Sequence, residues 1–187
     1  MSCKLSIRHL FALFLAAACA VGPVSAVQAA DAAPPKRAER PPPEPGKGSN
    51  TGLPVPRFVS LGSDKVNVRS GPGDRYPIVW QFVRRGLPVE ITAEFEYWRR
   101  IRDQDGAEGW VHKNLLSGRR FALIAGGIRN LHDDPSQDST VVMQAEPGVQ
   151  GRLLNCKDSW CRMEVNGRRG WLPRMQLWGV YADETIE

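Results

Sequence analysis

The chain has 187 residues, with 25 Lys and Arg against 20 Asp and Glu, 42% hydrophobic residues, 15 prolines and 18 glycines. This composition excludes a protein with many membrane spans and is typical of a globular chain that carries some unfolded sequence. Residues 1–30 hold two bases and no acid, so removing them leaves a net charge of about +3, far below what binding along nucleic acid requires. We therefore expect no nucleic-acid partner.

The N-terminus predicts an export signal. Lys4 and Arg8 precede an apolar run over residues 10–20, which is too short to span a bilayer. Small residues follow at the spacing that a signal peptidase recognises, so we predict a signal peptide over residues 1–30. The mature protein is then periplasmic or secreted and has no integral membrane segment. An uncleaved anchor and lipidation at Cys19 are the alternatives, the latter because the residues before this cysteine loosely resemble a lipobox.

Residues 31–56 predict a disordered, Pro-rich linker. Eight of the 15 prolines lie between Pro34 and Pro56, interleaved with charged residues and with almost no apolar ones. Such a segment cannot bury enough surface to fold, so we expect an extended tether. A proline-rich ligand for a partner protein is the alternative.

From residue 57 onward the chain repeats itself. Six anchor points recur at offsets of 61 to 63 residues, which predicts a duplicated unit of about 62 residues. The pairs are Asn67-Val68 with Asn130-Leu131, Pro72 with Pro135, Ile78-Val79 with Val141-Val142, Gly86 with Gly148, Trp98 with Trp160, and Gly109-Trp110 with Gly170-Trp171.

Each copy reads as a series of short strands. In the second copy, residues 150–155, 160–165 and 168–172 are predicted strands, and Asn166-Gly167 supplies a type I′ hairpin turn between the last two. Asp105-Gly106 occupies the matching turn of the first copy. Neither copy keeps apolar residues at helical spacing over three turns, so we expect two small all-β barrels.

Alternation along two strands assigns their faces. Trp98 shares one face with Arg100 and Arg102, whereas Ile101 lies on the opposite face. In the second copy one face carries Trp160, Arg162 and Glu164, and the other carries Cys161, Met163 and Val165. Both tryptophans are therefore expected on the wetter face.

The cysteines predict one disulfide. Cys3 and Cys19 leave with the signal peptide, and an exported chain with only Cys156 and Cys161 remaining suits a single bridge. The two lie on neighbouring predicted strands across a tight turn, where a bridge is geometrically reasonable. We expect no metal site, because the remaining histidines lack ligand spacing, and no cofactor.

These residues resemble a known family, the bacterial Src-homology-3-like (SH3-like) domain. The likeness in the first copy covers nearly all of residues 57–118 and rests on Val66-Asn67-Val68-Arg69-Ser70-Gly71-Pro72-Gly73, Tyr76-Pro77-Ile78-Val79, Gly86, Trp98-Arg99-Arg100-Ile101, Gly106 and Gly109-Trp110-Val111. The second copy is similar in its latter half, but His132-Asp133-Asp134 departs from the pattern, which puts in doubt a ligand site on its first loop.

The resemblance implies two tandem SH3-like β-barrels, over residues 57–118 and 119–181, followed by a C-terminal tail over residues 182–187. It also implies a non-enzymatic module, since members of this family often bind peptidoglycan. No nucleophile with a base, metal motif or phosphate loop appears in the chain, and Asp103 and Asp105 are assigned to turn hydrogen bonding.

The candidate ligand contacts combine arginine forks with flat aromatic faces, which suit glycan strands that carry carboxylated peptides. They are Arg69, Tyr76, Trp80, Trp98, Arg100 and Trp110, all in the first copy. The predicted partner is peptidoglycan or another envelope protein, with a periplasmic interaction scaffold or regulatory subunit as the alternative function. A thiol-dependent enzyme is a third hypothesis. The sequence predicts no oligomeric state.

Overall fold

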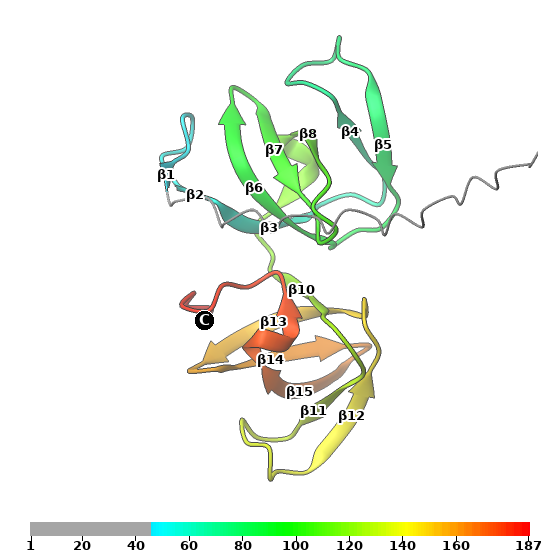
Figure 1. Cartoon of the computed structure of the whole chain (residues 1–187), viewed down its shortest axis with the longest axis vertical. Helices are drawn as coiled ribbons and strands as arrows, with labels where there is room; N and C mark the ends of the chain where they lie inside the picture. The colour runs from blue at the N-terminus through cyan, green and yellow to red at the C-terminus, as the bar shows by residue number, and fades with distance from the viewer. Residues whose placement is uncertain (1–45) are drawn as a thin grey trace, which may run out of the picture. The chain divides into compact units, whose positions relative to one another are not determined.

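The computed structural model describes residues 46–187, so the predicted signal peptide and most of the predicted linker lie outside the described residues. The described part contains two antiparallel sheets of seven strands each, which form two successive barrels (Figure 1). The expectation of an all-β protein with two tandem barrels is therefore confirmed. No helix among residues 46–187 is long and apolar enough to cross a membrane.

The first barrel has the strand order β5-β4-β8-β7-β6-β3-β9. Its strands are β3 (Arg57–Leu61), β4 (Val66–Arg69), β5 (Ile78–Phe82), β6 (Pro88–Phe95), β7 (Trp98–Arg102), β8 (Glu108–His112) and β9 (Leu116–Ser117), with the 3-10 helix η1 (Lys113–Leu115) before β9.

The second barrel has the order β12-β11-β15-β14-β13-β10-β16, which matches the first barrel strand for strand. Its strands are β10 (Phe121–Ile124), β11 (Arg129–His132), β12 (Val141–Ala145), β13 (Gln150–Lys157), β14 (Trp160–Val165), β15 (Arg168–Pro173) and β16 (Leu177–Trp178), with η2 (Arg174–Gln176) before β16.

The correspondence between the barrels extends to their irregularities. The register of the first barrel shifts between Val68 and Arg69, and that of the second barrel shifts between Leu131 and His132. A second pair of shifts lies between β6 and β7 and between β13 and β14. The predicted repeat is thus a repeat of backbone geometry, including its bulges.

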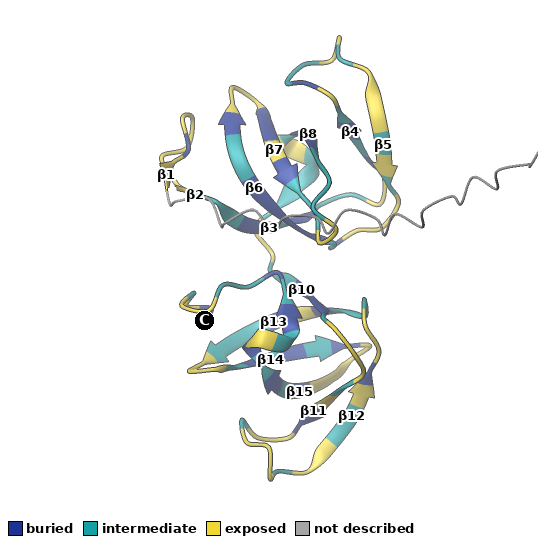
Figure 2. Cartoon of the chain, viewed as in Figure 1, coloured by how far each residue is buried: buried dark blue, intermediate teal, exposed yellow. Residues whose placement is uncertain are grey.

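Alternating apolar residues build a separate core inside each barrel (Figure 2). Ile101 and Val111 are fully buried in the first barrel, as Cys161 and Met163 are in the second. The prediction for Trp98 is wrong, because this residue is only 8% exposed instead of lying on a wet face. The ring of His112, its partner on β8, packs edge-on against it at 5.5 Å.

Local turn chemistry behaves as the sequence predicts. Asn166 and Gly167 have positive φ angles of 49° and 79°, as a type I′ turn between β14 and β15 requires. In the matching turn, the carboxylate of Asp103 accepts hydrogen bonds from the backbone N–H groups of Asp105 and Ala107. Asp103 therefore has the structural role predicted for it.

Residues 46–55 contain a short hairpin, although the sequence assigned them to the disordered linker. β1 (Gly46–Lys47) pairs with β2 (Pro54–Val55), and the turn between them lies against Glu94 on β6. The carboxylate of Glu94 accepts hydrogen bonds from the backbone N–H groups of Asn50 and Thr51, and from the Thr51 hydroxyl at 2.7 Å. The buried carboxylate of Glu94 therefore orders residues 46–55, which could not fold alone.

The end of the chain packs onto the second barrel. Cys156 and Cys161 form the predicted disulfide between β13 and β14. The backbone N–H of Cys156 donates to the carbonyl of Ile186, whose side chain is buried in the core of this barrel. Residues 182–187, predicted as a tail, are thus held against the fold.

Aromatic residues of the two barrels also contact each other. Phe58 on β3 meets Trp178 edge-on at 5.1 Å and Tyr181 at 4.7 Å. The Tyr181 hydroxyl donates to the carboxylate of Glu90 on β6, which also accepts from Arg102. Trp178 of β16 and Tyr181 after it therefore pack on Phe58, and the carboxylate of Glu90 binds the hydroxyl at the edge of this apolar contact.

Candidate functional site

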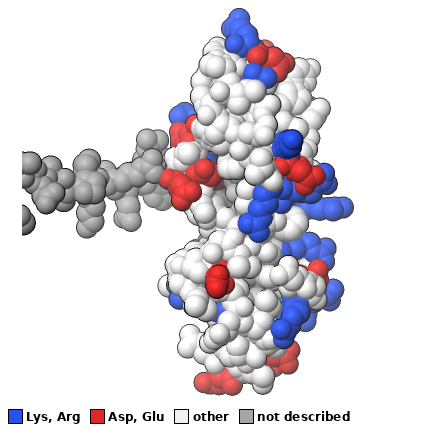
Figure 3. All heavy atoms as spheres, turned by 90° about the vertical axis from the view of Figure 1, so that its right-hand side faces the viewer, with Lys and Arg blue, Asp and Glu red and all other residues white. Residues whose placement is uncertain are grey.

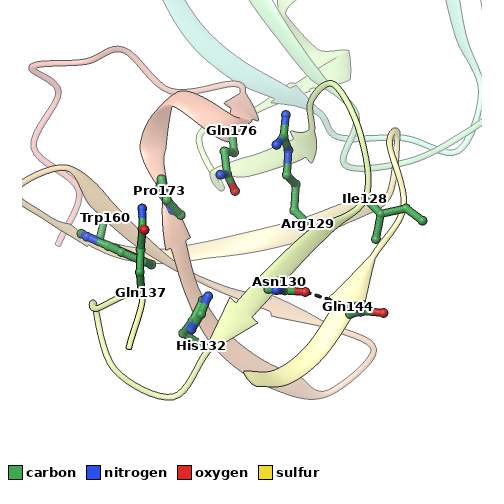
Figure 4. Close-up of a pocket in the computed structure, with 9 residues that line it drawn as sticks. All are labelled: Ile128, Arg129, Asn130, His132, Gln137, Gln144, Trp160, Pro173 and Gln176. Atoms are coloured by element: carbon green, nitrogen blue, oxygen red, sulfur yellow. Dashed lines mark hydrogen bonds between the residues drawn. The ribbon is translucent and has the colours of Figure 1, made fainter. Parts of the chain in front are cut away.

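The second barrel carries a pocket of about 590 Å³. Figure 4 shows that its walls come from strands β11, β12, β14 and β15, from the loop after β11, and from η2. The residues that line it are Ile128, Arg129, Asn130, His132, Gln137, Gln144, Trp160, Pro173 and Gln176. Nearly all of them carry polar groups that are able to orient a ligand.

Two rings, those of His132 and Trp160, pack together at the base of the site. His132 is 8% exposed and meets Trp160 edge-on, with ring centroids 5.7 Å apart. Its Nδ1 lies 3.0 Å from the carbonyl oxygen of Ser139. Because a carbonyl only accepts, this contact places a proton on Nδ1 of His132.

Side-chain amides surround these rings. Gln144 donates to the side-chain oxygen of Asn130 at 3.0 Å, across the pair β11 and β12 (Figure 4). The amides of Gln137 and Gln176 also line the pocket. An amide both donates and accepts, so this lining can bind a ligand that carries hydroxyl or amide groups.

Charge is sparse in the lining of the pocket. Arg129 is the one charged residue among the nine that line it, and its Nε donates to the carbonyl of Ala125 at 3.1 Å. No Asp or Glu is among those nine residues. The site can therefore hold a polar ligand that is largely uncharged.

A smaller and more apolar hollow of about 370 Å³ adjoins this pocket. The two share Gln137, Trp160 and Pro173, so Trp160 lies between them. The far side of the hollow includes Met175, whose side chain is 89% exposed. Together the two hollows offer a polar half and an apolar half on either side of one indole ring.

The sequence-predicted residues lie in the first barrel, around β4, β5, β7 and β8. Arg69 lies opposite Trp110 in register, and its guanidinium is 6.0 Å from the ring of Trp98. The structure therefore brings these three together, but Trp98 is buried beneath its neighbours. Tyr76 accepts a hydrogen bond from Arg69 through its backbone carbonyl, and its ring contacts Gly71.

The remaining predicted residues have partners within the barrel. Arg100 is exposed and forms an ion pair with Glu108 at 2.6 Å. Trp80 packs against the first core and meets Phe82 edge-on. Their part in ligand binding stays a prediction.

None of the residues that line the pocket of the second barrel was predicted as a site residue. The sequence signals for them are the repeat, which pairs Trp160 with the candidate Trp98, and the departure at His132-Asp133-Asp134, which pointed away from a ligand site in this copy. Within residues 46–187, no group of three or more His, Cys, Asp or Glu is placed to hold a metal ion.

Comparison with protein families gives one match that covers most of the chain. The model of the family described as "Bacterial SH3 domain" matches residues 62–118 and again residues 125–179. The two matched segments cover each barrel from the residue after its first strand, β3 or β10, to beyond its last.

One curated relative is the "Putative N-acetylmuramoyl-L-alanine amidase YrvJ" of Bacillus subtilis, which is 25% identical over 140 residues. The match covers 64% of this chain and 27% of the relative, so the chain spans about a quarter of that protein's length.

Two solved structures, of NlpC1 and NlpC2 from Trichomonas vaginalis, each share 16% identity with a TM-score of 0.32. They match 70% and 66% of this chain and 48% of each solved chain.

Proposed function

The chain belongs to the bacterial SH3 domain family, and we propose that it is an exported, non-enzymatic binding module of the cell envelope that contacts peptidoglycan. Both barrels match the family, and the described residues consist of these barrels with a short hairpin before them. The proposed activity is binding, and the proposed partner is the wall polymer.

The pocket of the second barrel is the observation that carries this proposal. It combines a partly exposed indole ring, that of Trp160, with side-chain amides that both donate and accept hydrogen bonds. Peptidoglycan presents N-acetyl, hydroxyl and peptide amide groups, all of which bind to such a lining. An indole ring adds a flat apolar face that desolvates the ligand.

The curated relative agrees with this partner. It is named as a putative N-acetylmuramoyl-L-alanine amidase, and N-acetylmuramoyl-L-alanine is a unit of peptidoglycan. The chain spans only about a quarter of that protein, so the similarity supports a shared partner and not a shared activity.

Two features support export. The predicted signal peptide over residues 1–30 would direct the chain out of the cytoplasm. The Cys156–Cys161 disulfide suits an oxidising compartment. We propose a periplasmic or secreted location on these grounds.

Charge alone makes a weak contribution to such binding. Lys and Arg side chains form patches on the face in Figure 3, but acidic side chains lie among them. A mixed surface of this kind gives weak adhesion that physiological salt screens. Binding that persists in salt therefore separates recognition at the pocket from adhesion.

Co-sedimentation of the exported protein with purified peptidoglycan sacculi tests the proposal, at low and at physiological salt. We expect binding that survives physiological salt and falls in a Trp160→Ala variant. A Trp98→Ala, Arg100→Ala variant measures the contribution of the predicted residues of the first barrel. Absence of sedimentation of the wild-type protein at physiological salt would reject the proposed partner.

A periplasmic interaction scaffold, or a regulatory subunit, is the second candidate. The exposed side chain of Met175 beside the apolar hollow favours it, because flexible methionine surfaces suit protein partners. Cross-linking in cells would then capture a specific protein in the wild type and lose it in Met175→Asp.

A further inference from the structure

The two barrels differ at one position of their common architecture. Arg69 ends β4 and His132 ends β11, and each residue follows the same register shift. Each also lies opposite a tryptophan of the neighbouring strand, Trp110 and Trp171 respectively. The two side chains therefore start from equivalent backbone positions.

In the first barrel the arginine spans the loop that follows its strand. The guanidinium of Arg69 donates to the carbonyl of Tyr76 at 2.7 Å and to the carbonyl of Asp74 at 2.9 Å. It also lies near the ring of Trp98, which His112 contacts from β8. Together these groups cover the indole, which explains why it is only 8% exposed.

In the second barrel the shorter imidazole contacts one loop carbonyl where Arg69 contacts two, and it packs edge-on against Trp160 at 5.7 Å. Nδ1 of His132 reaches the carbonyl of Ser139, which is the equivalent of Tyr76. The equivalent of Asp74 is Gln137, and its side chain lines the pocket beside Trp160. Pro173 replaces His112 opposite this indole, and it lines both hollows together with Trp160.

We infer that the Arg-to-His difference at position 132 makes the second barrel the ligand-binding copy, with a pocket that takes a neutral, N-acetylated glycan, while Arg69 fills the equivalent space in the first barrel. This inference rests on the proposed function and deepens it, since it names the residue that opens the site and the part of the wall polymer that binds there. The departure of the second copy from the family pattern is then the source of its site.

The composition of the pocket argues for the glycan over the charged peptides of the wall. Of its nine lining residues only Arg129 carries a charge, whereas Asn130, Gln137, Gln144 and Gln176 supply neutral amides. Sugar hydroxyl and N-acetyl groups match neutral amides, and the apolar face of a sugar ring matches the indole of Trp160. Binding to such a site depends little on salt.

The chain offers a matched control for this site. Gln144 donates to Asn130 in the second barrel, and Gln81 donates to Asn67 in the first at 2.6 Å. The two pairs are equivalent in the repeat, but only Gln144 lines the pocket. Replacing either glutamine by alanine removes the same hydrogen bond to an asparagine, but only the change at Gln144 removes a group that lines the pocket.

The experiment measures binding of soluble N-acetylglucosamine oligomers and of sacculi to the full exported chain. We expect His132→Arg to lose at least about tenfold in affinity for both, because the arginine would bond the Ser139 carbonyl and cover Trp160 as Arg69 covers Trp98. Gln144→Ala should lose about threefold to tenfold, and Gln81→Ala should bind as the wild type does. Thermal unfolding of each variant confirms that the barrels remain folded.

The outcomes separate this inference from the proposed function. Wild-type binding to sacculi with no loss in His132→Arg and Gln144→Ala, or binding of isolated stem peptides but not of oligomers, would overturn the inference and leave the envelope function standing. Oligomer binding that His132→Arg abolishes, without any binding to sacculi, would keep the pocket and reject its proposed partner. Absence of binding to both would reject the two together.

Discussion

The Thr51 hydroxyl donates a hydrogen bond to the carboxylate of Glu94, forty-three residues along the chain, at 2.7 Å. The same carboxylate pairs with Arg57 at 2.7 Å and lies 3.4 Å from Nε of Arg99, and its side chain is fully buried. One acidic group thus joins the short hairpin over residues 46–55 to the first barrel. Glu94 accepts hydrogen bonds from Thr51 of the hairpin and from Arg57 of the barrel.

Replacing Glu94 should release this hairpin. We expect Glu94→Ala to lower the free energy of unfolding by roughly 3–5 kcal/mol, because it leaves the buried guanidinium of Arg99 without its charged partner. Thr51→Val removes the hydroxyl that donates to Glu94 and accepts from the Leu53 backbone N–H, and it should cost about 1–2 kcal/mol. Urea unfolding measures both values. Limited proteolysis should cut residues 46–55 faster in both variants, and an unchanged cleavage rate would contradict this role of Glu94.

Acid should weaken the attachment of the hairpin over residues 46–55 to Glu94. Burial raises the pKa of the Glu94 carboxyl, but hydrogen bonds from Thr51, Arg57 and the backbone of Asn50 outweigh burial and lower the pKa from 4.5 to about 2. The folded state therefore binds this proton more weakly than the unfolded chain does, so the stabilisation is present above about pH 4.5 and is lost as the pH falls through 2.

Hydrogen exchange of the amides of Asn50 and Thr51 between pH 5 and 2 measures this loss. Protection should fall with pH after correction for the intrinsic exchange rate. A Glu94→Gln variant, which cannot ionise, should show no such trend, and an identical trend in both proteins would assign the effect to another group.

Tyr181 should resist ionisation. Burial raises the pKa of its phenol, and the hydrogen bond to Glu90 raises it further. Because the folded state favours the protonated phenol, its contribution to stability is full below pH 10 and is lost as the pH rises above that value. Tyr181→Phe should cost about 1 kcal/mol at neutral pH.

Absorbance titration of the phenols checks this prediction. The chain has three tyrosines, and in the wild type one of them should ionise only when the protein unfolds in alkali. In Tyr181→Phe that delayed step should disappear. Its persistence would show that another tyrosine is responsible.

Reduction of the disulfide should weaken the second barrel. The bridge closes a loop with a sequence separation of 5 residues, and the chain-entropy model gives about 2 kcal/mol for a loop of this size. A Cys156→Ala, Cys161→Ala variant should therefore unfold at lower urea while its peptidoglycan binding persists. If the variant lost binding but kept its stability, Cys156 and Cys161 would have a chemical role, as the hypothesis of a thiol-dependent enzyme requires.

The parts of the fold that the sequence predicted are those encoded locally. The Asn166-Gly167 turn, the alternation around Met163 and the spacing of Cys156 and Cys161 each act over a few residues. The hairpin over residues 46–55 could not be predicted in this way, because its ordering depends on a distant carboxylate.

The candidate site was the harder part to predict, for a physical reason. Alternation states which face Trp98 occupies but not that Arg69 and His112 cover it there. Whether a side chain fills a pocket or only lines it depends on its length. The guanidinium of Arg69 extends to the carbonyl of Asp74, whereas the shorter His132 contacts the carbonyl of Ser139. Family likeness favoured the copy that keeps the pattern, whereas the pocket around His132 and Trp160 is in the copy that departs from it.

The matching register shifts also show which features of the backbone the two barrels have in common. A bulge inserts a residue and redirects a strand, so it is costly to gain or lose without disturbing every later pairing. Both barrels have shifts at the same two places, before Arg69 and His132 and within the long β6–β7 and β13–β14 pairs. The two copies therefore keep the same backbone path at these positions and differ there through their side chains, as Arg69 and His132 do.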